Sequence, residues 1–121
     1  MLTSFGKSLR KLRIDNDELL KDMACKLGVT VSYLSAVEIG RREVPDAWIS
    51  IIAEEYNLDD KQVQELQNEA MMSKRTIKLQ LYDLDEEHKR IVISFARRYR
   101  ELNKEEIRQI QEIVAGRRND N

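Results

Sequence analysis

The sequence lacks the residues and runs that define several large classes of protein. Its single cysteine, Cys25, allows no disulfide within the chain, so nothing favours an oxidising compartment. One proline and four glycines are few for an all-β protein with many tight turns. No apolar run reaches the roughly 18 residues of a transmembrane helix, and the opening MLTSFGKSLRKLR has no apolar signal core. We therefore expect a cytoplasmic protein that does not enter a membrane.

The residues that are present favour a small helical protein. Apolar residues make up 41% of the 121 residues, enough for a modest core, and Leu, Glu, Lys, Arg and Ile dominate. The net charge of −1 is unevenly spread: residues 1–44 carry eight Lys/Arg against six Asp/Glu, residues 45–72 one against seven, and residues 73–121 twelve against nine. A nucleic-acid binder of this charge needs a local basic face, and its affinity should depend on salt.

Apolar spacing in the first part of the chain predicts five helices. Apolar side chains recur at intervals of three and four over residues 3–14, 17–27, 30–39, 45–56 and 60–72. Asn16 and Asp17 interrupt the pattern and are expected to cap the second helix. Gly28 follows that helix at a position that often requires positive φ, and Thr30 is the expected cap of the third.

Residues 73–121 carry a different pattern. Ile77, Leu79 and Leu81 alternate with polar neighbours, which predicts a strand over residues 75–82. We expect this strand to pair with its copy in a second chain, because one strand cannot satisfy its own edge. Helices over residues 85–102 and 104–115 would pack on that sheet, with Phe95 and Tyr99 among the dimerisation residues. The alternative is that residues 75–82 form a helical or extended linker.

The second and third predicted helices meet the steric demands of two short helices that cross steeply. A small residue, Ala24, stands where they would meet, and Gly28 allows the turn between them. The segment resembles the Cro/lambda-repressor-like (xenobiotic-response-element, XRE) helix-turn-helix family. The resemblance covers residues 3–70 and is strongest in the run MACKLGVTVSYLSAVEIGRR, residues 23–42.

The resemblance implies a role for each matching position. The helix over residues 30–39 would enter the major groove of duplex DNA. Within it, Val31, Ser32 and Ala36 match positions that face base edges, and Thr30 and Tyr33 match positions near the sugar-phosphate backbone. After it, Arg41 and Arg42 match loop positions that contact phosphate. Arg13 and Glu38 match an internal ion pair that ties this helix to the scaffold.

Some positions depart from the family pattern or allow a second interpretation. Leu20 stands where relatives often carry a phosphate-binding Gln, and Ile39 replaces a residue that is usually polar or basic. Val31 and Ala36 can contact thymine methyls but cannot form bidentate hydrogen bonds to bases. DNA shape or a second half-site would then contribute to specificity. The alternatives are that Arg41 and Arg42 form only a solvated loop, that Ser32 only supports the helix start, and that Tyr33 packs on the preceding helix.

No constellation of residues indicates an enzyme. Cys25 and the only histidine, His88, have no neighbouring cluster of ligands or catalytic partners in the sequence. We therefore expect no catalytic residues, no metal and no cofactor. The basic residues Lys74, Arg75 and Lys78 either extend the DNA footprint or belong to a solvated linker.

These patterns predict an all-α protein of two regions. Residues 1–72 would form a five-helix, lambda-repressor-like domain, and residues 73–121 a strand and two helices for dimerisation or partner binding. The expected function is that of a bacterial or phage transcriptional regulator, a repressor, that binds double-stranded DNA as a homodimer. The alternative is an antitoxin-like or adaptor protein whose residues 73–121 bind a protein partner.

Overall fold

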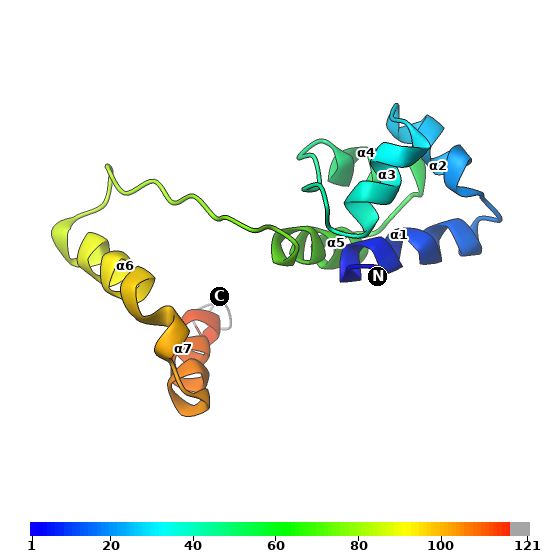
Figure 1. Ribbon diagram of the computed structural model, residues 1–121. Helices are drawn as coiled ribbons and strands as arrows, with labels where there is room; N and C mark the ends of the chain where they lie inside the picture. Colours follow the sequence, from blue (N-terminus) through cyan, green and yellow to red (C-terminus); the bar gives the residue numbers. More distant parts are fainter. Residues whose placement is uncertain (117–121) are drawn as a thin grey trace. The chain divides into compact units, whose positions relative to one another are not determined.

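The structure, a computed structural model, describes residues 1–116 (Figure 1). All regular elements in this range are helices, which confirms the predicted all-α class. None of them is both long and apolar enough to cross a membrane. The elements are α1 (Ser4–Asp15), α2 (Leu20–Leu27), α3 (Val31–Glu38), α4 (Trp48–Glu55), α5 (Asp60–Met72), α6 (Glu86–Arg98), the 3-10 helix η1 (Tyr99–Glu101) and α7 (Lys104–Gly116).

The chain divides into two units, Met1–Ile77 and Lys78–Asn121, which we call the N-terminal and C-terminal units. In the N-terminal unit, α1 contacts α3 and α5, α2 contacts α3 and α4, and α4 contacts α5 (Figure 1). Their apolar faces enclose one core, as amphipathic helices require. The largest fully buried side chains of that core are Phe5, Leu9, Met23, Leu34, Ile52 and Val37.

Local capping signals account for several helix ends. The Thr30 hydroxyl accepts a hydrogen bond from the Tyr33 N–H (3.0 Å) and so starts α3, as predicted. Gly28 ends α2 with φ 70°, in the left-handed region that glycine adopts without strain, which is also as predicted. A capping box between Asp59 and Gln62 is present at the start of α5.

The predicted start of α2 at Asn16 and Asp17 is wrong. Asn16 instead ends α1, and its side-chain amide donates to the Leu12 carbonyl (2.8 Å). Asp17 has φ 53°, which lets the chain turn between the two helices. Leu19 is the N-cap of α2, and its N–H donates to the Asp22 carboxylate (2.8 Å). Asp22, an acidic residue in the first turn of α2, thus makes the capping contact that was expected from Asn16 and Asp17.

The C-terminal unit contains α6, η1 and α7. The Asp85 carboxylate accepts from the His88 N–H (2.8 Å) and caps α6. Asn103 and Glu106 form a capping box at the start of α7. In contrast to the N-terminal unit, none of these three helices contains a buried residue.

The strand predicted over residues 75–82 is not confirmed by the structure of the single chain. No strand occurs in the part of the chain that the structure describes, and residues 76–81 have no regular secondary structure. Alternation of apolar and polar residues makes a segment suitable for a sheet, but a strand also needs a hydrogen-bonded neighbour. Residues 1–116 of one chain provide no such neighbour.

Candidate nucleic-acid interface

Helix α3 is fixed to the core along one side. Leu34 and Val37 of α3 are buried, and so is Ala24 of α2, the helix that packs against α3. The turn between α2 and α3 is held by a hydrogen bond from the Val29 N–H to the Ala24 carbonyl (3.0 Å). Because both helices are anchored through the same core, the outer face of α3 is presented by a rigid support.

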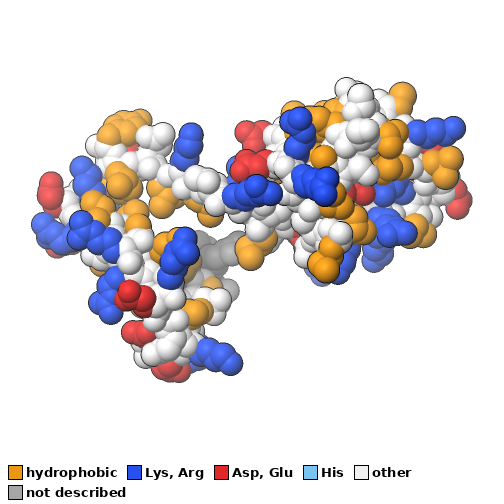
Figure 2. Space-filling model, in the orientation of Figure 1, with side chains coloured by type: hydrophobic (Ala, Val, Ile, Leu, Met, Phe, Trp, Pro, Cys, Tyr) orange, Lys and Arg blue, Asp and Glu red, His pale blue; other side chains and the backbone are white. Residues whose placement is uncertain are grey.

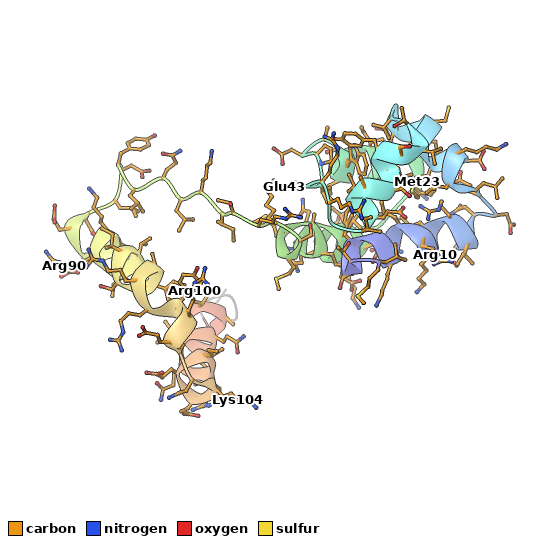
Figure 3. All side chains as sticks on the ribbon, viewed as in Figure 1. Arg10, Met23, Glu43, Arg90, Arg100 and Lys104 are labelled. Carbon is orange, nitrogen blue, oxygen red and sulfur yellow. The ribbon has the colours of Figure 1, made fainter. Side chains whose placement is uncertain are left out.

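A buried ion pair holds the C-terminal end of α3. Arg13 and Glu38 are 8% and 4% exposed, and their side chains form two hydrogen bonds of 2.5 and 3.3 Å. The Arg13 guanidinium also donates to the sulfur of Met23 (3.3 Å), which points from α2 into the interior of the N-terminal unit (Figure 3). The structure thus brings together the two residues that the sequence paired. Such a pair fixes geometry more than it adds stability.

The start of α1 closes on the same end of α3. The Glu38 carbonyl accepts from both the Thr3 N–H (2.9 Å) and the Thr3 hydroxyl (3.0 Å). Gly6 lies so close that a Cβ built on it would stand 2.3 Å from the Glu38 carbonyl oxygen. Sequence reasoning did not identify Gly6, because a glycine inside a helix gives no local sign that a distant carbonyl needs its space.

The first turn of α3 is open to solvent. Val31 is 42% exposed, Thr30 and Ser32 are exposed, and Ala36 and Tyr33 are half-buried. The first turn of α3 has no acidic residue. The positive end of the helix dipole and the exposed side chains therefore face solvent together.

A basic loop is tied to α3. The N–H groups of Arg41 and Arg42 both donate to the Ala36 carbonyl, at 2.9 and 3.3 Å, while their side chains remain exposed. The Arg75 guanidinium donates to the Gly40 carbonyl (3.2 Å) and so places a third cation beside this loop. We call Arg41, Arg42 and Arg75 the basic patch. Glu43, the next residue of the loop, is exposed as well, and acidic side chains lie among the basic ones on the face drawn in Figure 2 (Figures 2 and 3).

Tyr33 joins the basic patch to the core. Its ring lies 6.0 Å from the Trp48 ring, at an interplanar angle of 55°, and the Arg42 guanidinium lies 4.8 Å from the centre of the Tyr33 ring. Tyr33 is therefore packed between a buried aromatic residue and an exposed cation.

A second polar network connects α2 to the end of α4. The Glu18 carboxylate accepts from the Tyr56 hydroxyl (2.5 Å) and pairs with Lys26, whose ammonium lies 4.5 Å from the centre of the Tyr56 ring. Burial acts to raise the pKa of Glu18, but hydrogen bonds from Lys26 and Tyr56 outweigh it, so this pKa is lowered. Burial, together with the hydrogen bond to Glu18, raises the pKa of Tyr56. Sequence reasoning missed this network, since its members are up to 38 residues apart.

The residues expected to support dimerisation are not all brought together. Leu79, Phe95 and Tyr99 line one groove of the C-terminal unit, whereas Ile77 and Leu81 are not among its lining residues. Phe95 and Tyr99 stack, with ring centres 6.0 Å apart. The groove is therefore built mainly by the helices and not by the segment that was predicted as a strand.

Cys25 and His88 are the two residues that the sequence analysis considered for metal binding or catalysis. Cys25 and His88 are both exposed, and the His88 ring lies within hydrogen-bonding distance of its capping partner Asp85. Across residues 1–116, no group of three His, Cys, Asp or Glu side chains is arranged to hold a metal ion.

In comparisons with protein-family models, curated proteins and solved structures, nothing matches this chain.

Proposed function

We propose that the protein is a sequence-specific regulator, a repressor, that binds double-stranded DNA in the cytoplasm. In this proposal α2 and α3 form a helix-turn-helix of the lambda-repressor type, and α3 enters the major groove. The observation that carries this proposal is that a basic loop is attached directly to α3, whose first turn is exposed. The N–H groups of Arg41 and Arg42 in this loop donate hydrogen bonds to the Ala36 carbonyl of α3.

Each surface has a different task in the proposal. Val31, Ser32 and Ala36 face the base edges, where Ser32 can hydrogen-bond and the two apolar side chains can contact thymine methyls. Thr30 lies near the sugar-phosphate backbone. The basic patch contacts phosphates and supplies the sequence-independent share of the affinity.

The outer face of α3 could bind DNA or could simply be exposed to solvent. The rigid support of this helix favours DNA binding. The buried Arg13–Glu38 pair and the close approach of Gly6 to Glu38 fix one end of the helix, and Leu34 and Val37 fix its inner side. Specific readout needs side chains held on rigid elements. With so few base-bonding groups on α3, we propose that two copies read neighbouring half-sites and that DNA shape contributes.

The proposal is tested by selecting bound sequences from random duplex DNA and measuring affinity for the selected duplex by fluorescence anisotropy. Arg41→Ala with Arg42→Ala should weaken binding to all duplexes and flatten the salt dependence, by about one unit of slope for each phosphate that is no longer neutralised. Ser32→Ala should change the selected sequence more than the non-specific affinity. Equal binding of duplex and single strand, or an unchanged affinity of the double variant, would overturn the proposal.

A matched control removes the same charge from another face. Arg10 and Lys11 are exposed on α1, where Figure 3 labels Arg10. Arg10→Ala with Lys11→Ala lowers the net charge by the same two units as the loop variant. We expect this control to keep most of the affinity and the selected sequence, because the charges it removes are not in the basic patch.

A further inference from the structure

The C-terminal unit has an apolar groove that is left open by those of its residues that the structure describes. The groove has a volume of about 680 Å³ and is lined mainly by α6, η1 and α7. Its lining includes Ile91 and Phe95 of α6, Tyr99 of η1, Ile110 and Ile113 of α7, and Leu79 from the segment before α6. Its walls remain open to solvent: Ile91 and Ile113 are each 71% exposed. Helices of this length draw most of their stability from packing an apolar face, and here the face is unpacked.

We propose that the occupant of this groove is the same groove of a second copy of the chain, in a two-fold symmetric interface. Among its lining residues, the groove holds one cation, Arg98, and one anion, Glu106. In a two-fold interface each copy offers the same surface, so Arg98 of one copy can face Glu106 of the other, twice. The groove is thus complementary to itself in charge as well as in apolarity.

The alternatives fit these observations less well. The N-terminal unit has a closed core of its own, and an acidic or basic partner would be matched by a groove charged with one sign. A pair of two-helix units gives a four-helix arrangement, in which the apolar faces meet at the centre. Interfaces between identical subunits are also more apolar than other interfaces, which suits a groove with this lining.

This inference deepens the proposed function, because it identifies how two copies come together to read two half-sites. It also changes the expected interface: Phe95, Tyr99 and Leu79 belong to it, and no intermolecular strand is required. The two ideas fail separately. A dimer that ignores DNA would overturn only the proposed function, whereas a monomer that binds DNA would overturn only the interface.

The first test compares two isoleucines of α6 in the full chain without DNA. Ile91 lines the groove, whereas Ile93, 40% exposed, is not among its lining residues. In sedimentation equilibrium we expect the unaltered chain and Ile93→Asp to be dimers. Ile91→Asp should raise the dimer dissociation constant by at least about 30-fold, because it puts a charge into an apolar interface. A monomeric unaltered chain, or equal effects of the two variants, would overturn the proposal.

The second test asks whether the charges meet between copies. Arg98→Glu puts two anions in each groove, and Glu106→Arg puts two cations, so each variant alone should dimerise more weakly than the unaltered chain. An equimolar mixture should regain the dimer, since the all-acidic groove of one variant then faces the all-basic groove of the other. Pairing within one chain cannot give this rescue. A mixture that stays monomeric, or variants that dimerise alone as the unaltered chain does, would overturn the proposed pairing.

Discussion

The Arg13 guanidinium and the Glu38 carboxylate meet in the interior of the N-terminal unit, 25 residues apart in the sequence. Their contact joins the last turns of α1 and α3 through hydrogen bonds of 2.5 and 3.3 Å. Both charged groups are buried, so their attraction is offset by the cost of removing them from water. The pair therefore mainly fixes the position of α3. It should affect the free energy of unfolding strongly only when one partner is removed and the other charge stays buried.

Arg13→Met tests that view. The substitution leaves the Glu38 carboxylate buried without its cation, and we expect the free energy of unfolding to fall by about 3–5 kcal/mol. The double variant Arg13→Met with Glu38→Leu removes both charges and should recover a large part of this loss. Urea denaturation of the three chains measures both effects. Equal stability of the unaltered chain and the single variant would show that the pair does not hold α3.

Gly6→Ala should be destabilising although alanine is the better helix former. A Cβ at this position would stand 2.3 Å from the Glu38 carbonyl oxygen and 2.9 Å from its carbon, so α1 and α3 must separate. The expected cost is about 1–3 kcal/mol, the usual range for forcing extra volume into a packed interior. Gly116→Ala is the matched control, because a Cβ there meets nothing within 4 Å. Thermal unfolding of both variants measures the difference, and an equal melting temperature for the two would contradict the expected cost of the Gly6 substitution.

The features that could be predicted from sequence are those with a local cause. Thr30 and the Asp59–Gln62 pair act on backbone groups three residues away, and Gly28 acts on its own φ angle. Gly6 was not predicted because its requirement comes from Glu38, on another helix. The Glu18–Tyr56 hydrogen bond is missed for the same reason, since no spacing rule links residues 38 positions apart.

The predicted strand is not confirmed, for a related reason. The alternation of Ile77, Leu79 and Leu81 satisfies the pattern of one face of a sheet, but pairing depends on a neighbour that the sequence cannot reveal. Residues 76–81 have no regular structure in the single chain, and only Leu79 of the three apolar residues lines the groove. The Arg13–Glu38 contact, by contrast, was expected from the family resemblance and not from local spacing.

The pH dependence of stability should report the Glu18 network. The pKa of Glu18 is lower in the folded chain than its ordinary value of 4.5, so its carboxylate adds stability above that pH. That stability is lost as the pH falls through the folded pKa. Glu18→Gln should cost about 1–2 kcal/mol at neutral pH, and the two chains should converge in acid. Urea denaturation over a pH series measures this, and a constant difference at every pH would contradict it.

Tyr33 is expected to act on DNA binding through Arg42 and not through its own hydroxyl. If its ring holds the Arg42 guanidinium, 4.8 Å from the ring centre, then Tyr33→Phe should bind the selected duplex as the unaltered chain does. Tyr33→Leu should weaken binding by about 2–5-fold, the size of an exposed cation–π contact. In the Arg42→Ala background the same change should have no further effect, because the positioned cation is gone. Unfolding curves check that the loss of packing on Trp48 leaves each variant folded during the assay. An equal loss in Tyr33→Phe and Tyr33→Leu would instead assign the effect to the hydroxyl, as a direct contact with the DNA backbone.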